Sequence, residues 1–315
     1  MLRVGILGMG AMGREHARAW SRIPGAVLAG AHDPLAGPGE WPGPAAPVRL
    51  FKEARELVES REVDVLDICA PPGEHLSLVL LACRAGKPVF CEKPLARDLA
   101  SALAIRHAAR EAGLPLMVGQ VLRYFPAYAE ARRTVESGIL GKARSARLAR
   151  LVPRPRADWY FDFEKSGGCL LDTGIHDLDF LRWTFGNPLA VSCRAGGPSE
   201  LARGRDWARA GLDFGGGFRA ELEVAWADQE GIATRLELEG DRARLACLSG
   251  PAALEIRFAD GRVERRDLPG EDPFELELAD FKRALESGEE MPVGIEEGLA
   301  SLRLALDCLR AAGTA

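Results

Sequence analysis

The sequence lacks three features that would place it among membrane, secreted or nucleic-acid-binding proteins. No apolar run approaches the roughly 20 residues that are needed to cross a bilayer. The first ten residues, MLRVGILGMG, are typical of a strand and a turn and have none of the layout of a secretory signal. The net charge of −5 argues against a broad basic surface for nucleic acid. We therefore expect a cytoplasmic protein with neither a membrane nor a nucleic acid as its partner.

Paired cysteines are lacking as well. The chain has seven cysteines, an odd number, and none of them forms a C-x-x-C pair. They are scattered at Cys69, Cys83, Cys91, Cys169, Cys193, Cys247 and Cys308. This pattern indicates neither a disulfide framework nor a zinc site, so we predict buried free thiols and no metal. Cys169 would need a base beside it to act as a nucleophile, and His176, which is close in sequence, is better used in another role.

The chain does contain the proportions of a globular protein, with 47% hydrophobic and 28% charged residues and enough length for about two domains. Its first 120 residues alternate short apolar runs with helical patterns. Strands are predicted at Arg3–Leu7, Val27–His32, Val63–Cys69, Val89–Cys91 and Leu116–Gly119, and helices at about 11–22, 52–60, 74–85 and 98–112. Continuous apolar strands separated by helices predict a parallel sheet covered on both faces, which is the doubly wound α/β architecture.

One segment departs from this alternation. Residues 34–47, PLAGPGEWPGPAAP, contain five prolines and no helical periodicity. We predict an irregular surface loop there. The helix that often follows the second strand in folds of this class is therefore expected to be shortened or missing.

The pattern changes after about residue 125. A helix at 127–137 is followed by alternating strands, by a helix that begins near Thr173, and by strand-like runs from Ala190 to Asp267. Strands without helices between them predict an antiparallel sheet. Two further helices are predicted at about 273–287 and 295–311.

A glycine-rich motif follows the first predicted strand. Gly8, Gly10 and Gly13 match G-x-G-x-x-G and open an amphipathic helix. Gly8 would allow a tight turn, Gly10 a close approach to a pyrophosphate, and Gly13 close packing of helix on strand. Ala11 and Met12 add N–H groups at the positive end of the helix. The motif predicts a dinucleotide site, although a glycine-rich turn without a cofactor is the alternative.

Asp33 lies 20 residues after Gly13, at the end of the second predicted strand. A carboxylate there can accept hydrogen bonds from the adenosine ribose and repel a 2′-phosphate. No Arg or Lys follows directly, so NAD is favoured over NADP. The alternative is a turn aspartate before Pro34, and the unusual segment 34–47 borders the site.

Two more motifs carry residues suited to acid–base chemistry. Lys93 follows a predicted strand, at the carboxyl edge where open α/β sheets bind ligands. Asp172 and His176 are four residues apart, so both side chains can face the same way if Asp172 lies in or next to the first helical turn. A carboxylate beside an imidazole stabilises its cation and fixes its orientation.

In these motifs the sequence resembles the Gfo/Idh/MocA family of oxidoreductases along nearly its whole length. The matching stretches are the glycine-rich motif, Ala70–His75, Ala85–Pro88, Glu92–Pro94, Gly119–Tyr128, Ser137–Gly141 and Gly167–Asp179. The resemblance implies a Rossmann domain followed by an α/β domain with an open, largely antiparallel sheet. We place these domains at 1–122 and 123–315, with the last helix a candidate to pack back on the first domain.

The resemblance also implies roles for single residues. Lys93, Asp172 and His176 would be catalytic, with the histidine as general acid or base, and all three would bind substrate. Near the cofactor we expect Pro71, His75, Glu92 and Lys93, and near the active-site cleft Arg123 and Trp159. A structural role remains the alternative for each residue. Lys93 could be a surface lysine, and His176 a helix histidine satisfied by Asp172 or Asp179. Glu92 could be a structural partner, and Trp159 and Tyr160 could belong to the core.

The expected reaction is the reversible, NAD-linked oxidation of a secondary alcohol to a ketone, on a cyclic polyol or sugar derivative by analogy with the family. One alternative is a regulator that senses NAD(P) or a sugar without turnover. Another is reduction of a non-sugar carbonyl, such as a dihydrodiol-like compound or a keto acid. An open sheet would leave apolar surface exposed, so a homodimer or homotetramer is expected.

Overall fold

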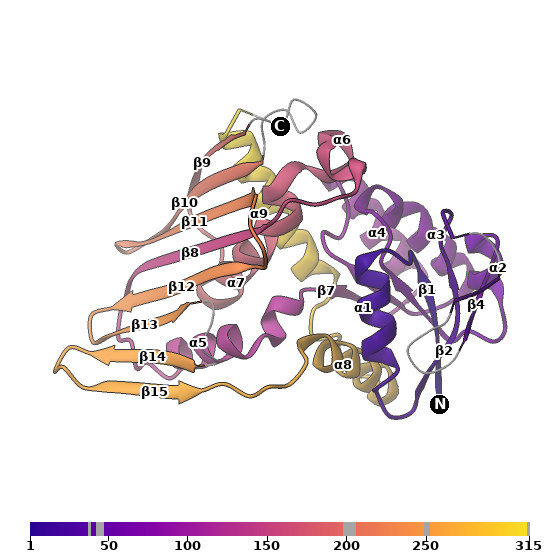
Figure 1. Cartoon of the computed structure of the whole chain (residues 1–315), viewed down its shortest axis with the longest axis horizontal. Helices are drawn as coiled ribbons and strands as arrows, with labels where there is room; N and C mark the ends of the chain where they lie inside the picture. The colour runs from indigo at the N-terminus through magenta and orange to yellow at the C-terminus, as the bar shows by residue number, and fades with distance from the viewer. Residues whose placement is uncertain (37–38, 42–46, 198–205, 249–252, 314–315) are drawn as a thin grey trace. The chain divides into compact units, whose positions relative to one another are not determined.

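The computed structural model describes residues 1–36, 39–41, 47–197, 206–248 and 253–313. The chain divides into two compact units, each built around one sheet (Figure 1). The first unit consists of 1–121 with 272–300, and the second of 122–271 with 301–315.

The first unit holds a seven-stranded sheet in the order β3-β4-β2-β1-β5-β6-β7. Its strands are β1 (Leu2–Leu7), β2 (Ala26–His32), β3 (Gly39–Trp41), β4 (Val48–Leu50), β5 (Val65–Ile68), β6 (Val89–Glu92) and β7 (Leu116–Gly119). Six strands are parallel, and β3 runs antiparallel to β4 at the edge. Every residue of β5, β6 and β7 is buried, because the sheet is covered on both faces. The doubly wound prediction is confirmed.

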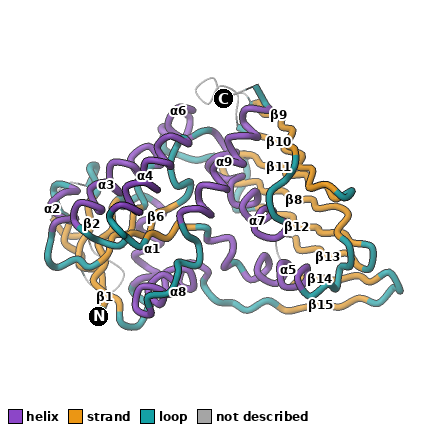
Figure 2. Tube along the Cα trace, turned by 180° about the vertical axis from the view of Figure 1, so that it is seen from behind, coloured by secondary structure: helices purple, strands orange, loops and turns teal. Residues whose placement is uncertain are grey.

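The helices of this unit begin and end at residues that suit these positions. They are α1 (Ala11–Trp20), α2 (Ala54–Glu59), the short 3₁₀ turn η1 (Pro72–Glu74), α3 (His75–Ala85), α4 (Leu99–Glu111), α8 (Pro273–Ser287) and the start of α9 (Ile295–Ala311). Asp98 caps α4 by accepting the Ser101 N–H, and Asp272 caps α8 by accepting the Phe274 N–H. Helix α1 packs beside α8, and α3 beside α4 (Figure 2).

The prediction of an irregular loop at 34–47 is wrong in part. Residues Gly39–Trp41 form β3, which pairs antiparallel with β4, a strand that the sequence did not predict. Residues 37–38 and 42–46 lie outside the described residues. Proline argues against a helix here, but it is tolerated next to an edge strand, which lacks a partner on one side.

The second unit holds an eight-stranded sheet in the order β15-β14-β13-β12-β8-β11-β10-β9. Its strands are β8 (Ala143–Pro153), β9 (Ala190–Gly196), β10 (Trp207–Gly215), β11 (Phe218–Ala227), β12 (Ala233–Gly240), β13 (Ala243–Leu248), β14 (Ala253–Phe258) and β15 (Val263–Asp267). Neighbouring strands are antiparallel except for β8 and β11. The prediction of an open, largely antiparallel sheet is confirmed.

Helices cover one face of this sheet. They are η2 (Val121–Tyr124), α5 (Pro126–Glu136), η3 (Asp158–Phe161), α6 (Phe163–Ser166), the π-helical turn η4 (Leu170–Gly174), α7 (Ile175–Phe185) and the end of α9. Both views show α5, α7 and α9 along the same face (Figures 1 and 2). Alternate residues of β11, from Phe218 to Trp226, are buried on this side. Across the described residues, no helix combines the length and the apolar character needed to cross a membrane.

Much of the opposite face of the sheet is charged, although Trp207 of β10 is 38% exposed on the same face. Arg147, Arg209 and Arg235 alternate with Glu221 and Glu223 around a depression of about 400 Å³. Arg209 and Glu223 form an ion pair at 2.8 Å across β10 and β11. Most polar residues of the alternating strands point outward, and most apolar ones pack under the helices. Oligomer formation stays a prediction.

Candidate active site

The glycine-rich loop requires glycine at two of its three positions for steric reasons. Gly8 has a φ of +97°, and a Cβ there would lie 2.7 Å from the Ala70 nitrogen. A Cβ on Gly13 would lie 1.9 Å from the Gly8 carbonyl oxygen. The turn after β1 and the first turn of α1 are thus pressed against the sheet, which brings the N-terminus of α1 to its carboxyl edge.

Gly10 is the position of the motif where no steric conflict requires glycine, because open space lies beside it. A Cβ built on Gly10 would have no neighbour within 4 Å among the described residues. No side chain there caps α1, and the first helical bond runs from the Arg14 N–H to the Gly10 carbonyl, so the amides of Ala11 and Met12 precede the helical ladder. Space and N–H donors at a helix N-terminus fit the pyrophosphate of a dinucleotide.

Asp33 is held by the same loop. Its Oδ2 accepts the Met9 N–H at 2.7 Å, and its Oδ1 accepts the Leu35 N–H at 2.8 Å. Each carboxylate oxygen keeps a further lone pair that a ribose hydroxyl can use. The negative charge at the end of β2 suits NAD and disfavours a 2′-phosphate.

The segment after β6 carries Lys93, whose side chain is half-buried. Glu92, the last residue of β6, is buried, and its Oε2 accepts the Lys93 backbone N–H at 2.9 Å. Lys93 thus stands at the carboxyl edge of the parallel sheet, as the sequence predicted.

His75 lies fully buried beneath this edge. Its Nε2 is 2.8 Å from the Ala70 carbonyl oxygen, and its Nδ1 is 3.1 Å from that of Pro94. Burial lowers the pKa of His75, while the carbonyl oxygens oppose this shift. The imidazole therefore ties the loop after β5, where Pro71 is exposed, to the segment after β6. A direct cofactor contact by His75 or Pro71 stays a prediction.

In the second unit, Asp172 and His176 lie within one helical turn of each other. Asp172 belongs to the π-helical turn η4, a kind of turn that is frequent at functional sites, and His176 to the first turn of α7. Both side chains are half-buried. The Asp172 Oδ2 accepts the Thr173 hydroxyl at 3.0 Å and the Trp226 indole N–H at 3.4 Å.

Aromatic side chains adjoin Asp172. Trp159 stacks on Tyr160 with ring centroids 3.8 Å apart, and Tyr160 meets Trp226 edge to face at 6.2 Å. Trp159 and Tyr160 are half-buried, whereas Trp226 is buried. The row of three rings thus ends at the indole that bonds Asp172.

Buried ion pairs hold α7, and sequence reasoning predicted neither of them. Arg123, predicted near the substrate, pairs with Asp179 through two bonds of 2.7 and 2.8 Å. Arg150 pairs with Asp177 through bonds of 2.6 and 3.0 Å. Asp179, considered above as a partner for His176, is thus engaged with Arg123. A substrate contact by Arg123 stays a prediction.

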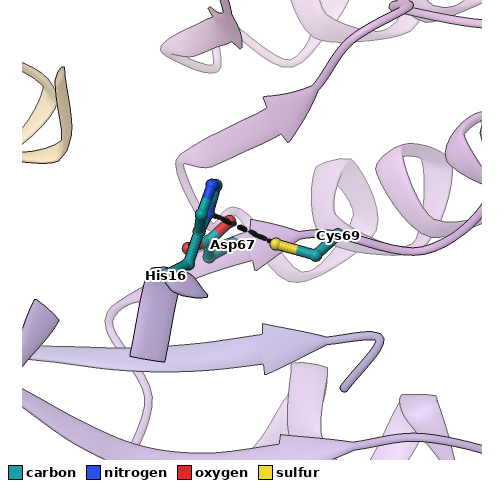
Figure 3. A group of neighbouring side chains, drawn as sticks. All are labelled: His16, Asp67 and Cys69. Carbon is teal, nitrogen blue, oxygen red and sulfur yellow. Dashed lines mark hydrogen bonds and ion pairs between the residues drawn. The ribbon is translucent and has the colours of Figure 1, made fainter. Parts of the chain in front are cut away.

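A buried cluster in the first unit was also missed. The Nδ1 side of the His16 imidazole on α1 faces Asp67 and Cys69 at the end of β5 (Figure 3). Its Nδ1 is 3.0 Å from Asp67 Oδ2 and 3.3 Å from the Cys69 sulfur. The sequence did contain one sign of this cluster: His16 is a polar residue on the buried side of α1, three positions after Gly13.

The predicted site residues are therefore found as two groups. Within the first unit, the glycine-rich loop, Asp33 and Lys93 share the carboxyl edge of the parallel sheet. Within the second unit, Asp172 and His176 share one turn beside the aromatic row. That the two groups form one site stays a prediction.

The fold and these features define a dinucleotide-binding α/β protein with a second unit that carries Asp172 and His176 in one helical turn. Residues 2–120 match the description "Oxidoreductase family, NAD-binding Rossmann fold", and residues 128–246 match "GFO/IDH/MocA C-terminal domain". The chain belongs to the Gfo/Idh/MocA oxidoreductase family. It is an NAD-dependent oxidoreductase, which confirms the predicted family, enzyme class and cofactor.

Known relatives cover nearly the whole chain. Inositol 2-dehydrogenase 2 of Saccharopolyspora erythraea is 31% identical, over 99% of this chain and 94% of its own. Inositol 2-dehydrogenase of Rhizobium meliloti is 28% identical, over 96% and 94%. Among solved structures, a UDP-N-acetylglucosamine 3-dehydrogenase from Acidithiobacillus ferrooxidans superposes with a TM-score of 0.81 at 26% identity, over 98% and 97%.

Proposed function

We propose that the enzyme oxidises a secondary alcohol of a cyclic polyol or sugar derivative to the ketone, reversibly and with NAD⁺. The observation that carries this proposal is that Asp172 and His176 lie within one helical turn, in the same unit as the stacked rings of Trp159 and Tyr160. Aromatic faces suit the apolar face of a sugar ring, and the carboxylate–imidazole pair suits a hydroxyl proton. The inositol dehydrogenases among the relatives support this substrate class.

Each catalytic residue has a separate role in the proposal. His176 accepts the hydroxyl proton at Nε2, because its Nδ1 is buried. Asp172 orients the imidazole and stabilises the cation that forms. Lys93 hydrogen-bonds the reacting oxygen and stabilises its developing charge. Bound NAD⁺ supplies the hydride acceptor, and Gly10, with the amides that follow it, would hold the pyrophosphate.

An absorbance screen for NADH formation tests the substrate class. The panel contains inositols, aldoses, a UDP-sugar, a dihydrodiol and a hydroxy acid, each with NAD⁺ and with NADP⁺. We expect turnover on at least one cyclic polyol or sugar, faster with NAD⁺. Turnover confined to the dihydrodiol or to the hydroxy acid, which is the reduced form of a keto acid, would show that the proposed substrate class is wrong. NADH binding without turnover on any compound would favour a sensor.

We further propose a cytoplasmic homodimer or homotetramer. All seven cysteines are free, which suits a reducing compartment. The alternating charges of Arg147, Arg209, Glu221 and Glu223 on the outer face of the second sheet can complement a second copy of the same face, related by a two-fold axis.

A further inference from the structure

One imidazole in the Rossmann domain lies between two buried carboxyl groups. On one side, His16 Nδ1 is 3.0 Å from Asp67 Oδ2 (Figure 3). On the other, His16 Nε2 is 3.1 Å from Glu92 Oε1, in a close ion-pair contact that is not a well-aligned hydrogen bond. His16 and Asp67 are fully buried, and Glu92 is 5% exposed. The three residues come from α1, β5 and β6. Their contacts therefore join two strands of the sheet to a helix that packs on it.

The surroundings favour a charged imidazole. Burial opposes the charge, but the carboxylate of Asp67 outweighs it, and the pKa of His16 is raised well above its ordinary value. Burial also raises the pKa of Cys69, so this residue remains a thiol and donates to Asp67 Oδ1 at 3.3 Å. The Trp20 indole N–H donates to Asp67 Oδ2 at 2.8 Å. Asp67 thus receives three donors, which is the pattern expected for a buried carboxylate.

The same cluster offers three atoms that could bind a metal, because ligand atoms of His16, Asp67 and Cys69 lie within 4.8 Å of one another. A structural zinc site takes four ligands. Here the three atoms bond one another, and the second imidazole nitrogen faces Glu92. We therefore interpret the cluster as a hydrogen-bonded network.

Glu92 connects the network to the segment that carries Lys93. Its Oε1 meets His16, and its Oε2 accepts the Lys93 backbone N–H at 2.9 Å. Space for the carboxylate depends on Gly119 of β7, where a Cβ would lie 3.1 Å from Oε1. The carboxylate is therefore fixed by His16 on one oxygen and holds the Lys93 backbone with the other.

We propose that His16 is a positioning residue of the enzyme: through Glu92 it fixes the backbone at Lys93, so that the lysine reaches the reacting oxygen. This inference rests on the proposed catalytic role of Lys93. The proposal predicts that loss of the contact between His16 Nε2 and Glu92 displaces Lys93 and so lowers turnover. Cofactor binding should stay nearly intact.

Two neutral variants separate the two sides of the imidazole. In His16→Gln the side-chain amide can reach the position of Nε2, and in His16→Asn the shorter amide can reach only that of Nδ1. We expect His16→Asn to lose about tenfold in kcat and His16→Gln to recover most of that loss. NADH affinity, measured by calorimetry, should change by less than about threefold in both. Equal losses in the two variants, or no loss in either, would overturn the proposal.

A double-mutant cycle with Lys93→Ala distinguishes positioning from general loss of structure. If His16 acts through Lys93, His16→Asn should add less than about twofold to the loss in a Lys93→Ala background. If the two losses multiply, the positioning role is wrong while Lys93 stays catalytic. If Lys93→Ala alone keeps full turnover, the proposed role of Lys93 fails, and the positioning role fails with it. Should His16→Asn not fold, Glu92→Gln takes its place in the cycle, with the same expected non-additivity.

Discussion

The two carboxylate oxygens of Asp33 both accept backbone N–H groups, from Met9 and from Leu35. One side chain therefore fixes the glycine-rich loop and places a negative charge at the end of β2. These two effects can be separated in part, because asparagine keeps one of the two acceptor oxygens and loses the charge.

We expect the unmodified enzyme to bind NADH more tightly than NADPH, and the difference to narrow about tenfold in both Asp33→Ala and Asp33→Asn, which corresponds to about 1.4 kcal/mol. Asp33→Ala should lower Tm more than Asp33→Asn, because alanine leaves both the Met9 and the Leu35 N–H without an acceptor, whereas the amide oxygen of asparagine can still accept one of them. Calorimetric titration with both cofactors and a thermal melt provide the measurements. Tighter NADPH binding by the unmodified enzyme would show that Asp33 does not select the cofactor.

Sequence reasoning could find Asp33 and Lys93 because each follows a recognisable strand. It could not find the network around His16, because His16 and Asp67 are 51 residues apart and meet only when α1 packs on the sheet. A buried histidine and a buried aspartate each look like an isolated polar residue in an apolar pattern. Their pairing depends on packing that periodicity does not encode.

Among the elements, α7 shows how buried charge can fix the helix that carries the proposed base, His176. Asp177 and Asp179 bind Arg150 and Arg123 on its covered side. His176 lies one residue before Asp177, so the rotation of α7 that suits these ion pairs also determines where the histidine points.

We expect Arg150→Ala to lower the free energy of unfolding by about 3–5 kcal/mol, because it leaves Asp177 buried without its charged partner. Arg209→Ala is the matched control: its ion pair with Glu223 is exposed, so the loss should stay below about 1 kcal/mol. Urea denaturation measures both. A loss below 1 kcal/mol for Arg150→Ala would mean that this ion pair does not hold the helix.

The long helix α8 was predictable from the sequence, and the short edge strand β3 was not. The α8 prediction at 273–287 agrees with Pro273–Ser287, because a capping aspartate, a proline and a terminal glycine mark its ends. Strand β3 has three residues, too few for an alternation to appear, and its existence depends on the neighbouring β4. Its proline-rich surroundings indicated a loop instead.

At the scale of the whole molecule, the second sheet offers an outer face that is charged over β8, β10 and β11. The reason is local: outward positions on these strands alternate with buried ones, and arginines and glutamates occupy many of the outward positions. Alternation was visible in the sequence, but which strands become neighbours was not.

Light scattering tests assembly. We expect about 68 or 136 kDa, that is two or four copies of the 34.0 kDa chain. If the charged face forms the contact, 1 M salt should shift the equilibrium toward smaller species, because it screens the exposed charges. A mass of about 34 kDa at all working concentrations would contradict the proposed oligomer.

The most direct test of the account is turnover and cofactor affinity in His176→Ala, with His107→Ala on the exposed side of α4 as the matched control. We expect His176→Ala to bind NADH nearly as the unmodified enzyme does and to lose roughly 10²–10⁴-fold in kcat, the usual contribution of a positioned acid or base. His107→Ala should keep full turnover. Full turnover in His176→Ala would contradict the assignment of the general base, and a collapse of NADH binding in that variant would show that the histidine is structural.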